Sequence, residues 1–236
     1  MDKSFTLGKS LSVVIPAYNE DDGLNNLVKE TLKDAAKITN DFEVIVVNDG
    51  SSDKTAVVAD SLAKTYKNVR VIHHIKNQGL SSAFRTGIKA CSKDVVLYIE
   101  GDGQQPLKDQ YQVLKKIKNA DVVLGTRSYR FDYSLFRKSL SYGFLFFLRL
   151  FFNLKYKDVG WSQAYRRKIF DSIELKSTTP FFCAELVIKA LRNGFKVTEA
   201  PVFYRARERG STHYGNILTA CKMLKEMMLL RFGFLD

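Results

Sequence analysis

Residues 42–53 read FEVIVVNDGSSD, a β-branched and apolar run that passes directly into polar, turn-forming residues. The run Phe42–Val47 predicts a short strand, and Asn48-Asp49-Gly50 predicts the turn that follows it. The same succession occurs earlier, where LSVVIPAYNE places a strand at Leu11–Ile15 ahead of polar residues. Strands with so few polar residues are typical of a parallel sheet that is covered on both faces.

Three similar runs and four segments with helical spacing complete the first half of the chain. The further strands are expected at Val69–His73, Val95–Ile99 and Val122–Leu124, and the helices at residues 21–37, 53–66, 80–91 and 107–118. Pro106 suits the first turn of the last helix. This alternation predicts an α/β fold with a mainly parallel central sheet and helices on both faces. Ligands of such sheets bind beyond the carboxyl ends of the strands, where the polar motifs of this chain fall.

The length of 236 residues fits one α/β domain with an appendage, or two small domains. The three cysteines, Cys91, Cys183 and Cys221, are far apart and form no CxxC pair. Their spacing argues against a disulfide framework or a zinc site and fits a reducing compartment. The N-terminus has no apolar run, so no signal peptide is expected.

Positive charge is concentrated in the second half of the chain. Residues 1–126 hold 17 Lys/Arg and 16 Asp/Glu, whereas residues 127–236 hold 20 and 9, so nearly all of the net charge of +12 lies there. This asymmetry suggests a polyanionic partner, which could be nucleic acid, an anionic lipid surface or phosphorylated substrates. A basic surface without any specific partner explains the charge equally well.

Residues 139–154 read SLSYGFLFFLRLFFNL, with basic residues on both flanks. A membrane-spanning helix needs about 20 apolar residues, so this interrupted segment is too short. It predicts a helix lying in the plane of a membrane surface, and a buried core helix is the alternative. Residues 216–232 predict an amphipathic helix with Lys222 and Lys225 on its polar side, which could lie on a membrane, pack on the domain or dimerise. The protein is expected to be peripheral.

The loop after the first strand, Pro16-Ala17-Tyr18-Asn19-Glu20, lacks the glycine-rich turn of dinucleotide-binding folds. Its aromatic ring and carboxylate can hold a base and a ribose, or the string is only a turn and a helix cap. Asp49, after the second strand, is placed to accept hydrogen bonds from a nucleotide. Asp53 is expected to be a structural N-cap of the next helix.

After the fourth strand the chain reads Glu100-Gly101-Asp102-Gly103-Gln104-Gln105-Pro106. Acidic and amide oxygens at alternate positions suit a hard divalent cation such as Mg²⁺ or Mn²⁺. Such an ion would bridge the diphosphate of a donor and neutralise charge as the leaving group departs. A solvated acidic turn is the alternative.

These three loops together resemble the family 2 glycosyltransferases of the GT-A fold, with their P-x-Y-N-E, D-G-S-x-D and D-x-D motifs. Further matches place the chain near dolichyl-phosphate mannose synthases and other polyprenyl-phosphate glycosyltransferases. They are Asn77-Gln78-Gly79 with Ala83 and Gly87, Gly125-Thr126-Arg127, Gly160 before Ala164-Tyr165-Arg166, and Pro201 before Arg207-Glu208-Arg209-Gly210-Ser211-Thr212-His213. The resemblance covers about residues 11–214.

The resemblance implies a role for each matching residue. A nucleotide-diphosphate sugar, with GDP or UDP, would be held by Pro16, Tyr18, Glu20, Val47, Asp49, Gly101, Asp102, Arg127, Arg207 and His213. Asp102 and Gln104, with Glu100 in support, would bind Mg²⁺ or Mn²⁺. Asp102 and Arg127 would be catalytic. The implied domain is residues 1–214, with a nucleotide and metal half at 11–126, an acceptor and membrane-facing half at 127–214, and a C-terminal helix at 215–236.

Four residues depart from the pattern of the family. Glu100 stands where Asp is usual, Asn48 replaces the first Asp of D-D-G, and Gln163 replaces an Arg that is common before the Y-R pair. His213 stands where many relatives have Lys, so its charge depends on pH. These departures bear on metal ligation and on the acceptor side.

A hydroxyl acceptor normally needs a general base. Base-using relatives often carry a Glu-Asp pair at the entry of the helix after the acceptor site, whereas the stretch 180–186 here has only Glu185. A phosphate monoester, with a second pKa of about 6, needs no base, and Arg127, Arg207 and Arg209 suit the alignment of two anions. We therefore expect an inverting, base-free transfer of a mannose- or glucose-like sugar to polyprenyl or dolichyl phosphate at the cytoplasmic face of a membrane.

Three other functions compete with this expectation. The first is a family 2 transferase that acts on a glycan or polysaccharide hydroxyl. The second is a basic nucleic-acid-binding protein, which the interleaved cations and aromatics would favour but for which no recognised motif is present; we expect no nucleic-acid partner. The third is a transferase-like regulator in which the Glu100 variant no longer catalyses. A membrane-protein partner or a homo-oligomer also stays open.

Overall fold

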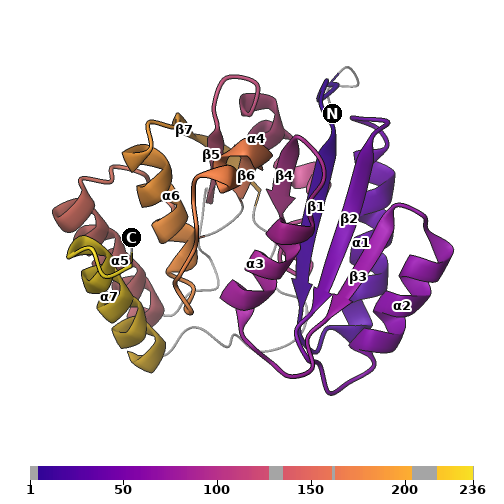
Figure 1. Ribbon diagram of the computed structural model, residues 1–236, viewed down its shortest axis with the longest axis horizontal. Helices are drawn as coiled ribbons and strands as arrows, with labels where there is room; N and C mark the ends of the chain where they lie inside the picture. Colours follow the sequence, from indigo (N-terminus) through magenta and orange to yellow (C-terminus); the bar gives the residue numbers. More distant parts are fainter. Residues whose placement is uncertain (1–4, 128–134, 161–162, 204–216, 236) are drawn as a thin grey trace.

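The computed structural model describes residues 5–127, 135–160, 163–203 and 217–235 (Figure 1). Its strands are β1 (Leu11–Ala17), β2 (Phe42–Asn48), β3 (Val69–His73), β4 (Val95–Tyr98), β5 (Val122–Arg127), β6 (Gln163–Arg166) and β7 (Val197–Val202). Its α-helices are α1 (Asp21–Ala35), α2 (Thr55–Thr65), α3 (Leu80–Ala90), α4 (Tyr111–Lys116), α5 (Leu135–Phe152), α6 (Phe182–Arg192) and α7 (Ile217–Arg231). Two 3₁₀-helices, η1 (Leu107–Gln110) and η2 (Arg167–Asp171), complete the described elements.

The strands form one seven-stranded sheet in the order β3-β2-β1-β4-β6-β5-β7. All neighbouring pairs are parallel except those of β6, which runs antiparallel to both β4 and β5. The predicted α/β fold with a mainly parallel central sheet is therefore confirmed, and two strands, the reversed β6 and the parallel β7, are additions to it. Because both halves of the chain contribute strands to this sheet, the division into residues 11–126 and 127–214 stays a prediction about function.

Successive residues of each central strand face opposite layers of helices. On β1, Leu11, Val13 and Ile15 pack in the cluster with α1, α2 and α4, whereas Val14 packs in the cluster with α3, α5, α6 and α7. Strand β4 divides in the same way. Figure 1 shows the consequence, with α1 and α2 on one side of the strands and α3 on the other. The double coverage explains why these strands contain so few polar residues.

Two expectations about helix starts need correction. The helix expected at 107–118 is broken into η1 and α4, and Pro106 precedes η1 in an extended conformation with φ −61° and ψ 148°. Lys54, rather than Asp53, occupies the N-cap position of α2. The Asp53 carboxylate nevertheless accepts hydrogen bonds from the amides of Thr55 at 2.9 Å and Asp21 at 3.4 Å. It therefore joins the starts of α1 and α2, which agrees with the structural role expected for it.

Residues 139–152 of the apolar segment lie in α5, which is apolar on two faces. Phe147, Leu148 and Phe151 pack in the core cluster. Tyr142, Phe146 and Leu150 repeat every four residues on the other face and are 65%, 59% and 61% exposed. The alternative of a buried core helix is thus realised on one face of α5, whereas the placement of its exposed face on a membrane surface stays a prediction.

The C-terminal helix α7 packs beside α5 (Figure 1). Met227 and Leu230 are buried, whereas Ile217 and Leu218 at its start are exposed. The apolar residues at the start of α7 therefore face outward, whereas those near its end face the core. Lys222 and Lys225 are exposed as expected. Within the described residues, no helix has both the length and the apolar character that crossing a membrane requires.

Gly87 shows how closely α3 approaches the sheet. A Cβ atom at this position would lie 2.3 Å from Cγ1 of the buried Val14. We expect Gly87→Ala to lower the free energy of unfolding, because overpacking costs about 1–3 kcal/mol and outweighs a helix-propensity gain of about 1 kcal/mol. Urea denaturation measures the effect. Gly23→Ala, in α1 with nothing within 4 Å of its Cβ position, is the control and should raise the stability. A rise in both variants would contradict the close packing.

Candidate active site

The carboxyl ends of β1, β2 and β4 meet at one edge of the sheet. Ala17 and Asn48, the last residues of β1 and β2, are paired in register. The amide of Asp49 donates to the carbonyl of Ala17 at 2.9 Å, and the amide of Gly101 donates to the carbonyl of Pro16 at 3.2 Å. The three polar loops predicted from the sequence are therefore adjacent in space, as the topology of a parallel sheet requires.

Two glycines allow the loops to approach each other so closely. A Cβ atom on Gly101 would lie 2.7 Å from the carbonyl oxygen of Pro16. Gly50 has a φ of +66°, and a Cβ atom there would lie 2.3 Å from the backbone carbon of Lys76. A larger residue at either position would move a loop of the site.

Asp49 is buried, and its carboxylate holds the start of α3. Oδ1 accepts the amide of Gln78 at 3.0 Å, and Oδ2 accepts the amide of Gly79 at 2.8 Å. Nδ1 of His74 lies 2.6 Å from Oδ1, and Nε2 of His74 lies 2.9 Å from the hydroxyl of Thr86. Asp49 thus fixes the geometry of the expected nucleoside site. His74 was missed in the sequence, where only its place directly after a predicted strand marked it.

Asn48, one of the departures from the family pattern, is also buried and takes part in a second chain of contacts. Its Oδ1 accepts the amide of Ser51 at 3.2 Å, and its Nδ2 lies 3.0 Å from Nδ1 of His73. Nε2 of His73 lies 3.0 Å from Oδ1 of Asp60 on α2. An Asn suits this position because the same side chain donates to the ring nitrogen and accepts from the loop.

The loop after β1 is tied to the loop after β2. The amide of Asn19 donates to the hydroxyl of Ser51 at 3.0 Å, and Oδ1 of Asn19 accepts the amide of Ser52 at 2.9 Å. The amide of Glu20 donates to the hydroxyl of Thr55 at 2.8 Å. Asn19 has a φ of 56°, which its side-chain bond helps to stabilise. These contacts place Tyr18 and Glu20 beside the turn that carries Asp49.

The expected metal ligands lie together on the loop after β4. Oδ1 of Asp102 accepts the amide of Gln104 at 3.0 Å, and the hydroxyl of Tyr98 donates to Oε1 of Glu100 at 3.4 Å. Across the described residues, no group of three or more His, Cys, Asp or Glu side chains could hold a metal ion by itself. Two carboxylates and an amide do fit Mg²⁺ or Mn²⁺, because such ions use one or two carboxylates together with substrate phosphates.

Arg127 ends β5 and forms a bidentate ion pair with Asp158. Nε of Arg127 lies 2.7 Å from Oδ2, and Nη2 lies 3.2 Å from Oδ1. Next to Asp158 in the chain, the carbonyl of Val159 accepts a hydrogen bond from Nε2 of Gln163 at 2.6 Å. Burial raises the pKa of the nearby Cys183 thiol well above its usual range, and the charges of Glu100 and Asp158 add to the shift. Asp158 was also missed in the sequence, where it is an isolated acid in a basic region.

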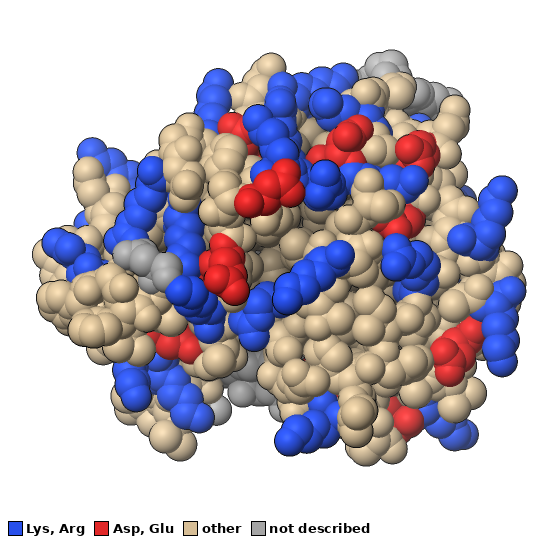
Figure 2. All heavy atoms as spheres, viewed as in Figure 1, with Lys and Arg blue, Asp and Glu red and all other residues tan. Residues whose placement is uncertain are grey.

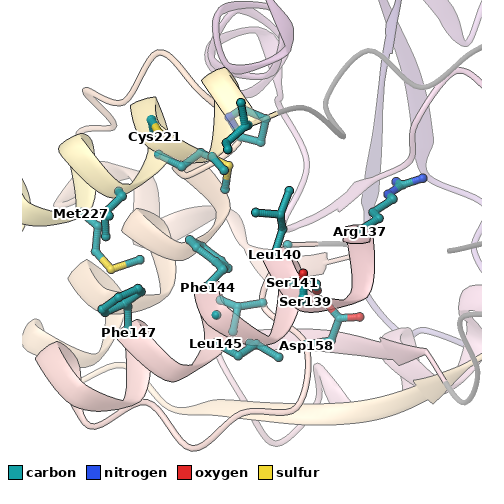
Figure 3. A pocket seen from close by; sticks show the side chains of 18 of the residues that line it. Arg137, Ser139, Leu140, Ser141, Phe144, Leu145, Phe147, Asp158, Cys221 and Met227 are labelled. Atoms are coloured by element: carbon teal, nitrogen blue, oxygen red, sulfur yellow. The ribbon is translucent and has the colours of Figure 1, made fainter. Parts of the chain in front are cut away.

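A pocket of about 450 Å³ runs from Arg127 between α5 and α7 (Figure 3). Figure 3 shows Arg137, Ser139, Ser141 and Asp158 toward one end and Phe147 and Met227 toward the other. The remaining lining residues include Leu140, Phe144, Leu145, Cys221, Met223 and Leu224. The pocket therefore combines a charged end with an apolar body, a shape that suits an amphiphilic ligand.

Glu185 is fully buried and bonded to its own surroundings. Oε1 accepts the amide of Lys176 at 2.9 Å and lies 3.0 Å from Nζ of Lys189, while Oε2 accepts the amide of Ser177 at 2.9 Å. Both oxygens are thus used by neighbouring donors. This geometry favours a structural role, paired with the cation of Lys189, over that of a general base.

The structure brings together most of the predicted site residues but not all of them. Pro16, Asp49, Gly101 and Asp102 share one edge, whereas Val47 packs beneath α3 with Ile45 and Ala83 and can contribute only its backbone. Arg127 lies two strands from β4, beside the pocket. Arg207, Arg209 and His213 lie outside the described residues, so their predicted roles stay predictions.

Comparison with known proteins gives the family of this fold and site. Residues 12–174 match the family described as "Glycosyl transferase family 2". The chain is 32% identical over 216 residues to an undecaprenyl-phosphate 4-deoxy-4-formamido-L-arabinose transferase from Photorhabdus laumondii, covering 89% of this chain and 65% of the relative. It is 31% identical over 211 residues to a dolichol-phosphate mannosyltransferase from Pyrococcus furiosus, covering 86% and 58%. The chain thus spans less than two thirds of the length of these two relatives.

Solved structures give the same fold. A glucosyl-3-phosphoglycerate synthase from Mycobacterium tuberculosis, in complex with Mn²⁺, UDP and glucosyl-3-phosphoglycerate, superposes with a TM-score of 0.73 at 19% identity, over 97% of this chain and 82% of the other. A complex of the same synthase with Mg²⁺ and UDP superposes with a TM-score of 0.73 at 17% identity, over 97% and 81%. These matches establish the GT-A fold and show that structural neighbours bind a divalent metal with UDP.

The contacts of Glu185 lead to a test of its role. In Glu185→Gln the side-chain amide cannot accept from all three donors, and breaking a buried ion pair costs about 3–5 kcal/mol. We expect the free energy of unfolding to fall by about 3–5 kcal/mol. The kcat of the folded protein for sugar transfer should fall less than about tenfold, which corresponds to the loss of one hydrogen bond. Glu174→Gln, at an exposed position, should change neither. Unchanged stability together with a loss of about a hundredfold or more in kcat would identify a general base instead.

Proposed function

This chain belongs to glycosyl transferase family 2, and we propose that it moves a sugar from a nucleotide-diphosphate sugar onto a polyprenyl or dolichyl phosphate. The proposal draws on the relatives from Photorhabdus laumondii and Pyrococcus furiosus, whose names specify lipid-phosphate sugar transfer. A dolichyl-phosphate beta-glucosyltransferase from Trichomonas vaginalis, 29% identical over 241 residues, adds a third such relative and is covered to 74% of its length. The sugar would be mannose- or glucose-like, and the nucleotide GDP or UDP.

The donor would bind at the edge formed by the ends of β1, β2 and β4. Tyr18 and Glu20 lie there beside the turn of Asp49, where a base and ribose can be held. Glu100, Asp102 and Gln104 would hold Mg²⁺ or Mn²⁺, and the ion would supply charge neutralisation to the departing diphosphate. Gly101, packed against Pro16, would keep its loop close to the donor.

The observation that carries the proposal is the pocket between α5 and α7. It begins at Arg127, at the carboxyl end of β5, and continues among apolar side chains of both helices. An isoprenoid phosphate matches this order, with its anionic head beside Arg127 and Arg137 and its chain along Phe144 and Met227. A free sugar hydroxyl acceptor has no use for the apolar part of this pocket.

The contacts of Glu185 support a transfer without a general base. A phosphate oxygen already carries the charge needed for attack, because the second pKa of a phosphate monoester is about 6. This oxygen would attack the anomeric carbon while the bond from that carbon to the nucleotide diphosphate breaks, and the configuration would invert. Arg127, held in place by Asp158, would reduce the repulsion between the two anions.

The exposed face of α5 would dock on the cytoplasmic face of a membrane. Tyr142, Phe146 and Leu150 project from α5, and Ile217 and Leu218 project from the neighbouring α7. Figure 2 shows Lys and Arg side chains around an uncharged area at the left edge, where Figure 1 places these helices. Apolar side chains between cations suit a peripheral protein on an anionic lipid surface.

The central test compares acceptors with a radiolabelled nucleotide sugar. We expect a lipid-linked product with polyprenyl phosphate, and none with an oligosaccharide or with a polyprenol that lacks the phosphate. Asp102→Ala should slow turnover at least about a hundredfold, because a bound metal contributes several kcal/mol to charge stabilisation. Chelation with EDTA should do the same, and Mn²⁺ should restore only the unsubstituted protein. Asp171→Ala, a change at an exposed carboxylate, should leave the rate unchanged.

Glycosylation of the oligosaccharide alone would overturn the acceptor assignment. Full activity of Asp102→Ala would remove that residue from the mechanism. A steep, salt-dependent affinity for RNA without any binding of nucleotide sugars would favour a nucleic-acid-binding protein instead.

The membrane proposal has its own test in liposome flotation. Phe146→Ser with Leu150→Ser removes two exposed apolar side chains of about 1.5 kcal/mol each, so partition onto anionic liposomes should fall about a hundredfold. Val57→Ser with Ile75→Ser removes two apolar side chains that are at least as exposed but lie on α2 and after β3. This control pair should partition like the unsubstituted protein. Equal losses in both pairs would show that α5 is not the docking surface.

A further inference from the structure

Residues 176–180 lie between the pocket and the donor edge, which is the edge of the sheet formed by the carboxyl ends of β1, β2 and β4. They contact α3 on one side and line the pocket on the other. The hydroxyl of Ser81 and Nη1 of Arg85, both on α3, donate to the carbonyl of Ser177, the second at 2.5 Å. The same helix begins at Gly79, whose amide donates to Asp49. On the other side, Pro180 lines the pocket. This segment is thus a connection between the expected sites of donor and acceptor.

Glu226 of α7 holds this segment from the side of the pocket. Its Oε1 accepts the amide of Thr178 at 2.8 Å and the hydroxyl of Thr178 at 2.8 Å. Its Oε2 accepts the amide of Thr179 at 3.4 Å and the hydroxyl of Thr179 at 2.5 Å. A single carboxylate therefore receives four hydrogen bonds from two consecutive residues of the loop that leads into α6.

The two halves of α7 differ in how they are held. Glu226, Met227 and Leu230 anchor its C-terminal half, since the last two are fully buried. In its N-terminal half, Cys221 and Leu224 are exposed and Met223 is only partly buried against the core cluster, yet all three line the pocket. The position of this pocket wall therefore depends on how the C-terminal half is oriented.

We infer that Glu226 is a positioning residue for the acceptor, because it fixes the wall of the pocket contributed by α7 through Thr178 and Thr179. The inference rests on the proposed function in taking the pocket as the acceptor site. Loss of the Glu226 contacts lets α7 rotate about the buried residues Met227 and Leu230. This rotation widens the pocket and lowers its affinity for the lipid chain. The donor edge should keep its geometry, because Asp49 holds the start of α3 by contacts that do not involve Glu226.

The test uses Glu226→Gln, which keeps the shape of the side chain but replaces one acceptor oxygen by a donor group. Thr178→Val removes a single hydroxyl, which donates to Oε1 of Glu226. Glu30→Gln, at an exposed position of α1, is the matched control. The first readout is hydrogen exchange of the α7 amides, which requires neither substrate nor activity.

The second readout uses Cys221 as a natural probe. Cys221 is exposed, Cys183 is buried, and burial raises the pKa of the Cys91 thiol to about 12, so a maleimide reacts selectively at position 221. Polyprenyl phosphate should protect Cys221, and the half-protecting concentration reports binding directly. The third readout is the split between KM for the acceptor and kcat.

In Glu226→Gln we expect faster exchange in α7, and a rise of about tenfold in both the half-protecting concentration and the acceptor KM, as for the loss of a hydrogen bond to a charged group. kcat at saturating acceptor and the KM of the donor should stay within about twofold, and Thr178→Val should give a smaller rise of about threefold. If Glu226→Gln does not fold, Thr178→Val decides alone.

Each result separates this inference from the proposed function. Unchanged exchange or an unchanged acceptor KM in both variants, with normal transfer by the unsubstituted protein, would overturn the role of Glu226. A fall of about tenfold in kcat, with an unchanged KM for the acceptor, would also overturn the role of Glu226. If the unsubstituted protein neither transfers to polyprenyl phosphate nor is protected by it, the proposed function fails, while hydrogen exchange still reports whether Glu226 holds α7.

Discussion

The carboxylate of Asp49 is the interaction on which the site depends most directly. It accepts the amides of Gln78 and Gly79 and contacts His74, so it fixes the first turn of α3 against the end of β2. Helix α3 then holds Ser177 through Ser81 and Arg85. From there the contacts continue to Glu226 and α7. One buried acid at the end of a strand is thus the start of a path of hydrogen bonds that reaches the far wall of the pocket.

Three acids of this protein, Asp49, Glu185 and Glu226, share one physical role although they lie on different elements. Each receives backbone amides from a loop that would otherwise leave these donors unpaired. Unpaired buried amides are costly, and a carboxylate can satisfy several of them at once. Asp102 also accepts a backbone amide, but it lies on a partly exposed glycine-containing loop at the expected metal site. Asp49 and Glu185 are buried, whereas Glu226 and Asp102 are both half-buried, so burial alone does not separate the acids that hold loops from the acid expected to bind a metal. The contact of Asp49 with a nucleotide stays a prediction.

Much of the fold could be predicted from the sequence, because the central strands are buried on both faces and therefore read as apolar runs. The polar loops could be placed together for the same reason, since parallel strands share a carboxyl edge. The reversed strand β6 could not, because its four residues, QAYR, are too short to show a period. The pairing of Arg127 with Asp158 and the role of Glu226 depend on contacts between residues 31 and 48 positions apart, which local patterns do not encode.

The contact between Gly87 and Val14 also limits how the sequence can diverge. Because the methyl groups of Val14 occupy the space that a side chain at position 87 would need, the two positions cannot change independently. A shorter residue at position 14 would have to arise first and leave a temporary void, before anything larger than glycine could enter α3. In a lineage of such proteins the pair would therefore behave as one epistatic unit, with a fixed order of substitution.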